Sequence, residues 1–246
     1  RMGYWVDMKN PYITYDNRYI ETLWWLLKQL YNKNYLYKGY TIQPYSPAAG
    51  TGLSSHELNQ PGCYRDVKDT TCIAQFKVKN PRTEMTAFGE PYFLAWTTTP
   101  WTLPANVGLA LHPRFTYVAG RFMKNGQTEN LVIVKDLLDA FAQKTGWALA
   151  ETIREFKGAE LENCEARHPF LSRTSTIILA DFVTTDTGTG IVHIAPGHGA
   201  DDYNVGRQYG LPVLSPVDDD GKYTEEVGVP SLVGKHVFDA NKDIIS

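Results

Sequence analysis

The sequence is poor in several features that would define its class at once. It has only three cysteines among 246 residues, Cys63, Cys72 and Cys164, at irregular spacing. An odd, irregular set forms neither a disulfide framework nor a zinc pattern, so we expect a reducing, cytoplasmic setting. No apolar run approaches the roughly 18 residues of a membrane-spanning helix, so we expect no membrane contact. The first residues lack the pattern of a signal peptide, and we interpret the sequence as an internal fragment.

An excess of positive charge is also missing. The formal net charge is −3 at pH 7. Non-specific binding to nucleic acid depends on the neutralisation of phosphates by lysine and arginine. If RNA is a substrate, most of the binding must therefore come from elsewhere in a larger protein. The remaining composition, 43% hydrophobic and 21% charged, is typical of a globular protein and excludes a disordered chain.

The chain changes character near residue 75. Apolar residues at helical spacing predict a helix from Asp16 to Asn34, with Asp16 as the N-cap and an apolar face that packs against other residues. Proline and glycine interrupt residues 40–75, which we expect to be rich in loops. We therefore divide the chain into a helical lead-in with a connective segment, residues 1–75, and a core domain, residues 76–246.

Short runs typical of β-strands dominate the second part. The predicted strands are 93–99, 107–111, 116–122, 131–135, 175–183 and 188–195. Helices are predicted around 137–146, where Gly146 follows the last turn, and at 199–209, and residues 218–221 predict a hairpin turn. Strands that do not alternate regularly with helices predict an α+β fold with a barrel-like, mainly antiparallel β core and short peripheral helices.

Residues 96–106 form the most distinctive segment, Trp-Thr-Thr-Thr-Pro-Trp-Thr-Leu-Pro-Ala-Asn. On a strand, Thr97 and Thr99 share one face and Thr98 points the other way. Pro100 ends regular pairing, so we expect a rigid strand exit whose hydroxyls can bind a carbonyl oxygen, a ribose hydroxyl or water. An ordinary threonine-rich edge strand is the alternative, because threonine favours strands. No neighbouring lysine or histidine in the sequence marks one threonine as an activated nucleophile.

A second unusual segment spans residues 188–203, Gly-Thr-Gly-Ile-Val-His-Ile-Ala-Pro-Gly-His-Gly-Ala-Asp-Asp-Tyr. His193 faces the side of its strand opposite its two apolar neighbours, where it can line a site. Asp201 and Asp202 fall in the first turn of the next helix, where the helix dipole favours ionised carboxylates. A structural interpretation stays open, in which the aspartates only start the helix. Metal binding with His198 is a third interpretation, but the spacing matches no zinc signature and we predict no metal.

These two segments resemble the two signature segments of the editing domain of isoleucyl-tRNA synthetases, within the class I synthetase family. The resemblance covers the whole chain, since Gly-Tyr-Trp-Val-Asp at 3–7 and Tyr-Ile-Glu-Thr-Leu-Trp-Trp at 19–25 look like the lead-in to that domain. Valyl and leucyl relatives have Thr-Thr-Arg-Pro where this chain reads Thr-Thr-Pro-Trp at 98–101. Valyl relatives have a sequence similar to Val-Lys where this chain reads Val-His at 192–193, so the resemblance is to the isoleucyl type. The resemblance implies the synthetase editing-domain fold.

The resemblance also implies an activity and a set of site residues. The activity is hydrolysis of valine from mischarged isoleucine tRNA, with valyl-adenylate as an additional substrate, while isoleucine is spared. Asp202 matches the carboxylate that binds the α-ammonium group, and His193 the side chain whose bulk excludes isoleucine. The threonines and their neighbours match the walls around the ester. The expected catalytic residues are Asp202, His193, Thr97, Thr98 and Thr99, and the expected substrate-binding residues are Trp101, Thr102, Asn106, Gly197 and His198.

The chain departs from its relatives at one point, and two further motifs are missing. Many bacterial relatives have a Cys-Pro-x-x-Cys zinc knuckle where residues 45–50 read Tyr-Ser-Pro-Ala-Ala-Gly, so we predict no structural zinc there. The sequence contains neither His-x-Gly-His nor Lys-Met-Ser-Lys-Ser, which aminoacyl transfer requires, so we expect hydrolysis without synthesis. ATP and Mg²⁺ would serve only the full-length enzyme.

Two partners follow from the resemblance. They are the 3′ CCA end of isoleucine tRNA carrying valine and the remainder of the synthetase. A charge-assisted contact between Asp202 and a cationic aminoacyl ester supports the first partner independently. Two other functions stay open at the level of the sequence. They are a non-catalytic module that holds the tRNA 3′ end, and a free-standing metallohydrolase.

Overall fold

The computed structural model describes residues 3, 5–87 and 89–246. The predicted motif at residues 3–7 includes residue 4, which lies outside the described residues. The chain divides into two units, Arg1–Thr41 and Ile42–Ser246. The connective residues 42–75, which we expected to belong with the lead-in, fall with the second unit in this division. The two-part organisation with a boundary after residue 75 stays a prediction.

The first unit contains the predicted helix, α1 (Asn17–Asn32). Asp16 is its N-cap as predicted, because its carboxylate accepts a hydrogen bond from the backbone N–H of Arg18 at 2.9 Å. The predicted packing of the apolar face is not found, since no residue of this described helix is buried. Trp24, for example, is 71% exposed.

The second unit begins with a small hairpin and a short helix. Strands β1 (Tyr45–Ser46) and β2 (Thr51–Gly52) pair in the antiparallel sense around the turn at 47–50. Helix α2 (Ser55–Leu58) starts with a capping box, in which Ser54 and Glu57 bind each other's backbone N–H. Most of residues 40–75 is otherwise irregular, in agreement with the loop-rich prediction.

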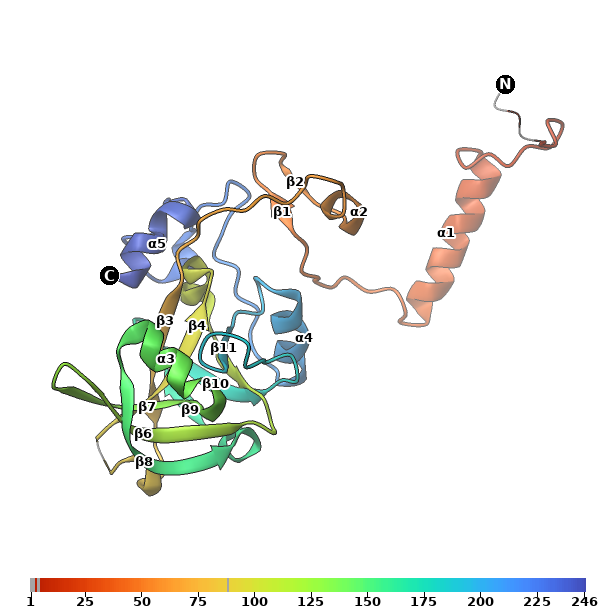
Figure 1. Ribbon diagram of the computed structural model, residues 1–246. Coiled ribbons are helices and arrows are strands. Elements are labelled where there is room, and N and C mark those ends of the chain that lie inside the picture. The colour runs from red at the N-terminus through yellow and green to blue at the C-terminus, as the bar shows by residue number, and fades with distance from the viewer. Residues whose placement is uncertain (1–2, 4, 88) are drawn as a thin grey trace. The chain divides into compact units, whose positions relative to one another are not determined.

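Six strands of the second unit close into a barrel. In order around the barrel they are β11 (Ile191–Ile194), β5 (Gly108–Leu111), β10 (Thr174–Leu179), β9 (Glu165–Arg167), β3 (Cys72–Lys79) and β4 (Pro91–Thr97). The pairing of Val192 on β11 with Trp96 on β4 closes the ring (Figure 1). This contact brings together two segments that lie about a hundred residues apart, and it runs parallel, so both strands end at the same edge.

Three more strands extend the sheet beyond β4. They are β7 (Gln127–Val134), β6 (Thr116–Lys124) and β8 (Ala148–Lys157). Asn125 and Gly126 both have positive φ, as a two-residue hairpin turn between β6 and β7 requires. Of the nine pairings in this sheet within the described residues, the pairs β10–β5, β11–β4 and β4–β7 are parallel and the others antiparallel. The predicted α+β fold with a mainly antiparallel barrel is confirmed.

Short helices surround this β core. The α-helices are α3 (Leu138–Thr145), α4 (Ala200–Gln208) and α5 (Val237–Ile245), and the 3₁₀ turns are η1 (Thr83–Met85), η2 (Pro100–Ala105), η3 (Lys135–Leu137), η4 (Gly158–Leu161) and η5 (Glu225–Val227). Gly146 ends α3 in the left-handed conformation, as predicted. The predicted hairpin turn is also present, because Gly221 N–H donates to the carbonyl of Asp218. Strands β1, β2, β3, β8 and β9 and helices α2 and α5 were not predicted. Among the described residues, no helix is long and apolar enough to cross a membrane.

The hydrophobic core fixes where the helices lie. Large side chains such as Phe76, Phe93 and Phe156 form the main cluster between the strands. Val205 of α4 packs with residues of β5, β10 and β11, so the start of α4 stays close to the end of β11. A separate cluster around Tyr223 and α5 packs against Trp101 of η2. Buried apolar contacts therefore hold both the turn that follows β4 and the helix that follows β11 in place.

Candidate functional site

The two distinctive sequence segments meet where β4 and β11 end side by side. Residues after β4 turn into η2, and residues after β11 turn into α4. Between them lies a cavity of about 300 Å³. Its lining includes seven of the predicted site residues, namely Thr97, Thr98, Thr99, Thr102, His193, His198 and Asp202. The rest of the lining is Trp96, Val192, Ala195 and Gly199.

The threonine segment leaves its strand earlier than predicted. Strand β4 ends at Thr97 and not at residue 99, because Pro100 begins the turn η2. The hydroxyls of Thr97 and Thr99 still lie together, 3.3 Å apart, and the Thr99 N–H donates to the Thr97 hydroxyl. Thr98 was predicted to point the other way, but it lines the same cavity and is solvent-exposed. The strand exit thus offers a cluster of hydroxyls to the cavity.

His193 forms a buried wall of this cavity. It lies on β11 and is only 6% exposed. Its Nε2 lies 2.8 Å from the hydroxyl of Thr102, and its Nδ1 lies 3.4 Å from Nδ2 of Asn106. Burial lowers the pKa of His193 to about 4, with smaller contributions from His198 and His168. The imidazole is therefore neutral at neutral pH.

Asp202 supplies the carboxylate of the cavity. It lies in the first turn of α4, as predicted, and its Oδ2 accepts a hydrogen bond of 2.8 Å from the N–H of Ala195. Burial raises the pKa of the Asp202 carboxyl, the Ala195 hydrogen bond opposes this rise, and the neighbouring Asp201 adds to it. Asp201 is exposed and does not line the cavity. A cation beside Asp202 would favour its ionised form.

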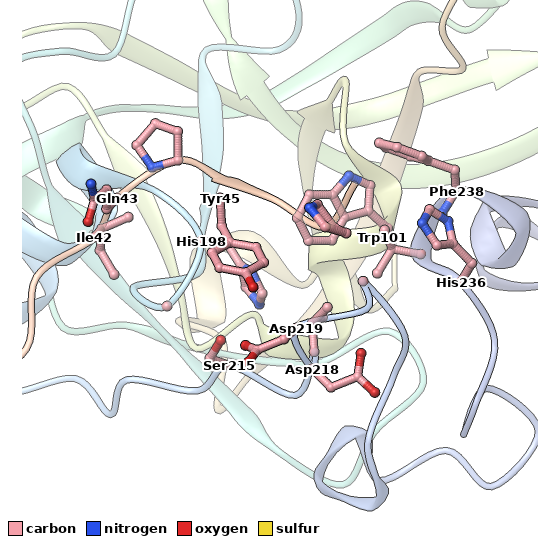
Figure 2. A pocket seen from close by; sticks show the side chains of 16 residues that line it. Ile42, Gln43, Tyr45, Trp101, His198, Ser215, Asp218, Asp219, His236 and Phe238 are labelled. Atoms are coloured by element: carbon pink, nitrogen blue, oxygen red, sulfur yellow. The ribbon is translucent and has the colours of Figure 1, made fainter. Parts of the chain in front are cut away.

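A second, larger cavity of about 480 Å³, shown in Figure 2, lies next to the first. The two share His198, and the predicted residues Trp101 and Gly197 line the second cavity only. The rings of His198 and Trp101 meet edge to face with centroids 5.2 Å apart. Burial lowers the pKa of His198 to about 4. Other side chains of the lining include Tyr45, Ser215, Asp218, Asp219, His236 and Phe238.

Asn106 lies outside the lining of both cavities. It is completely buried, and its amide donates to the carbonyl of Gly108 at 2.8 Å and accepts from the hydroxyl of Ser175 at 2.6 Å. Its direct contact with a substrate stays a prediction. The geometry instead gives Asn106 a contact with His193.

Several lining residues were not predicted from the sequence. Trp96, Val192 and Gly199 belong to the two distinctive segments, so their proximity to the predicted residues could have indicated them, whereas strand alternation placed Val192 on the face opposite His193. Tyr45, His236 and Phe238 come from parts of the chain far from both segments, and nothing in their local sequence marks them. Within the residues that the structure describes, no group of three or more His, Cys, Asp or Glu side chains is arranged to hold a metal ion.

Comparison with known proteins gives close relatives. Residues 1–212 match the family described as tRNA synthetases class I (I, L, M and V). The chain is 57% identical to the isoleucine–tRNA ligase of Bacteroides fragilis over 96% of its length, and 53% identical to that of Porphyromonas gingivalis over 90%. It covers only 22% and 21% of those two relatives.

Two solved structures share the fold at low sequence identity. The crystal structure of GlLeuRS-CP1 has a TM-score of 0.54 at 14% identity and covers 71% of this chain and 93% of its own. The editing domain of the P. knowlesi cytosolic leucyl-tRNA synthetase has a TM-score of 0.54 at 13% identity and covers 72% and 92%. The fold is thus that of a synthetase editing domain, as the sequence resemblance implied. By its sequence, the chain belongs to the class I tRNA synthetases.

Proposed function

We propose that this chain is the editing domain of an isoleucine–tRNA ligase, and that it hydrolyses the ester of valine on isoleucine tRNA while sparing the isoleucyl ester. One observation carries the proposal. A carboxylate, Asp202, and a bulky neutral side chain, His193, line one small cavity together with a cluster of threonine hydroxyls. The close similarity to isoleucine–tRNA ligases over nearly the whole chain supports the choice of amino acid.

An enzyme that attaches isoleucine to tRNA needs a hydrolytic site in addition to its synthetic site, because hydrophobic recognition alone discriminates weakly. One methylene group in an apolar pocket is worth about 1–3 kcal/mol, a limit for which isoleucyl-tRNA synthetases are themselves the standard example. A synthetic site that accepts isoleucine therefore also admits valine at an appreciable rate. A smaller cavity can reverse the preference by sterics, since forcing extra methylenes into a filled space is unfavourable.

The site residues suggest how the ester would be held. Asp202 would bind the α-ammonium group in a charge-assisted contact and so fix the amino acid. The hydroxyls of Thr97, Thr98 and Thr99 would polarise the ester carbonyl and position the attacking water. The oxygen of the water forms the new bond to the carbonyl carbon, and the ribose oxygen leaves with a proton. His193 would bound the side-chain end of the cavity.

The second cavity fits the nucleotide part of such a substrate. It adjoins the first through His198 and carries the aromatic side chains of Trp101, Tyr45 and Phe238. Aromatic rings provide stacking surfaces for nucleobases, and the carboxylates of Asp218 and Asp219 can accept hydrogen bonds from amino or hydroxyl groups. The terminal nucleotide of the CCA end would lie here, and the remainder of the synthetase would provide most of the affinity for tRNA, because the net charge of the chain is −3.

The proposed hydrolysis uses no cofactor. ATP and Mg²⁺ would serve the aminoacylation reaction of a full-length enzyme, and valyl-adenylate is a further proposed substrate of the same cavity. The free state of Cys63, Cys72 and Cys164 supports a reducing, cytoplasmic setting.

Deacylation assays in the full-length enzyme test the proposal. We expect rapid release of valine from isoleucine tRNA and slow release of isoleucine. His193→Ala enlarges the cavity, so release of isoleucine should rise by about 10- to 100-fold. His56→Ala, which changes an exposed histidine far from the site in sequence, is the matched control and should leave both rates unchanged. Tight tRNA binding without release of valine by the wild type would identify a docking module and refute the hydrolase.

A further inference from the structure

A continuous row of buried hydrogen bonds leads from strand β10 to the cavity wall. The Ser175 hydroxyl donates to Oδ1 of Asn106 at 2.6 Å, and Nδ2 of Asn106 lies 3.4 Å from Nδ1 of His193. Nε2 of His193 lies 2.8 Å from the Thr102 hydroxyl, which donates to the carbonyl of Thr99 at 2.8 Å. All four side chains are buried. No residue of strand β10 lines the cavity itself.

The direction of this row fixes the protonation of His193. A hydroxyl has one hydrogen, and that of Thr102 goes to the Thr99 carbonyl, so the Thr102 oxygen accepts from Nε2–H of His193. Asn106 is oriented at its other end, because its Oδ1 accepts from Ser175 and its Nδ2 donates to the Gly108 carbonyl. Nδ2 of Asn106 therefore presents its second N–H, and no acceptor, to Nδ1 of His193. The network selects the neutral tautomer with the proton on Nε2.

Both ring nitrogens of His193 are thus occupied by the protein. Only carbon atoms of the imidazole remain to face a substrate, so the ring acts as an apolar wall of fixed shape. This arrangement agrees with the lowered pKa of His193, which burial brings to about 4. It also removes His193 as a proton donor or acceptor in the reaction.

The backbone that carries Thr102 and Asn106 is itself clamped. Nε2 of His168 lies 2.8 Å from the carbonyl of Leu103, and Arg173 donates to the carbonyls of Pro104 at 2.8 Å and Asn106 at 3.3 Å. The turn η2 therefore cannot shift easily to relax a broken contact to His193.

We propose that Ser175 and Asn106 are positioning residues for amino acid selection, which hold the His193 ring in one tautomer and one orientation. The proposal rests on the editing function, because the fixed ring sets the size limit of the cavity. Loss of the Ser175 hydroxyl leaves Oδ1 of Asn106 without its donor, so only the bond from Nδ2 to the Gly108 carbonyl still orients the amide, and its contact with Nδ1 of His193 weakens. A ring held firmly only at Nε2 can tilt about its contact with Thr102 and widen the cavity.

Two readouts test the proposal. The first is ¹⁵N NMR of the histidine rings in the 246-residue chain, which reports the tautomer and pKa of His193 without any activity. The second is the ratio of valine to isoleucine release in the full-length enzyme. In Ser175→Ala we expect His193 to populate both tautomers. We also expect the ratio of valine release to isoleucine release to fall about tenfold. Ser175→Thr keeps the hydroxyl donor and should restore both readouts. Thr176→Val, which removes the next hydroxyl on β10, is the control.

A second variant addresses the other end of the amide. Asn106→Asp replaces the N–H donor with an acceptor, so Nδ1 of His193 should hold a proton and its pKa should rise. Thermal unfolding of each variant shows that the chain remains folded. If Ser175→Ala and Asn106→Asp leave the His193 resonances and the release ratio as in the wild type, the proposal is wrong. It is also wrong if the tautomer changes but the ratio does not. Absence of valine release in the wild type would instead refute the editing function, while the NMR result still reports on the hydrogen-bond row.

Discussion

At the scale of single residues, Asp202 combines a structural contact with a proposed binding role. One of its oxygens accepts from the Ala195 N–H, which ties the first turn of α4 to the end of β11. Burial raises the pKa of its carboxyl, so the ionised form is less favoured in the cavity than in water. A bound ammonium group would reverse this preference. The two roles can be separated because an amide retains the hydrogen bond and loses the charge.

Asp202→Asn should therefore reduce editing without reducing stability. Its amide oxygen can still accept from Ala195, while the contact with the α-ammonium group loses its charge. A hydrogen bond to a charged group contributes about 1.5–3 kcal/mol, so kcat/KM for valine release should fall by about 10- to 100-fold. Deacylation kinetics in the full-length enzyme and urea unfolding of the 246-residue chain measure the two effects.

Asp202→Ala is the companion variant. It removes both the charge and the acceptor, so it should lower kcat/KM to a similar extent and also reduce the free energy of unfolding by about 1–3 kcal/mol. A wild-type rate for Asp202→Asn would show that the carboxylate serves only to join α4 to β11.

At the scale of elements, the sequence predicted the regular strands and helices well and their ends less well. The local sequence located the helices α1, α3 and α4, and short runs of strand-forming residues located β5, β6 and β7. Strand β10 ends at Leu179 and not at residue 183 as predicted. Strand β8 escaped prediction because most of its residues are exposed on both sides, so it has no apolar alternation. Helix α5 was not predicted although its apolar residues recur at helical spacing, and they pack with Tyr223 and Trp101.

The site residues likewise divide into those that the local sequence could predict and those that it could not. Residues within the two distinctive segments could be predicted, because the strand ends bring them together in one place. Ser175 and Tyr45 could not, since a hydroxyl on a strand or a tyrosine in a loop acquires its role only through tertiary contacts. Trp101 was expected beside the threonines, and it lies in the neighbouring cavity because η2 turns it toward Tyr223 and α5.

The loop between β11 and α4 approaches the backbone at Leu214 closely, and a substitution can test this contact. A Cβ atom at Gly197 would lie 2.0 Å from the carbonyl oxygen of Leu214, a contact with backbone that cannot rotate away. Gly197→Ala must therefore push the two segments apart, and we expect it to lower the free energy of unfolding by about 1–3 kcal/mol. Urea unfolding measures this change.

Gly126→Asn is the control for that experiment. Gly126 also lacks a side chain, but a Cβ there meets open space, and asparagine tolerates its φ of 81°. It should change stability by less than about 1 kcal/mol. Equal effects of the two substitutions would show that the approach of Gly197 to Leu214 carries no special packing constraint.

At the scale of the whole molecule, the core keeps several histidines neutral. Burial lowers the pKa values of His168, His193 and His198 to about 4, from 6.5 in a free histidine. The unfolded chain therefore binds more protons than the folded chain between these values. Linkage then requires the free energy of unfolding to fall as the pH is lowered from 6.5 toward 4. The raised pKa of Asp202 acts in the opposite sense above 3.8 and offsets part of the change.

The chain should accordingly lose stability at mildly acidic pH. Each fully depressed histidine contributes at most about 1.4 kcal/mol per pH unit, so the slope reports how many remain neutral. Urea unfolding at pH 7.0, 6.0, 5.0 and 4.5 measures this slope. His198→Phe keeps an aromatic ring against Trp101 and removes one titrating group. The slope of its free energy of unfolding against pH should therefore be smaller by up to about 1.4 kcal/mol per pH unit, which corresponds to one proton. If the free energy of unfolding stays constant from pH 6.5 to 4.5 in both the wild type and Asp202→Asn, these histidines bind protons in the folded chain as in the unfolded chain, and the apolar-wall role of His193 fails as well.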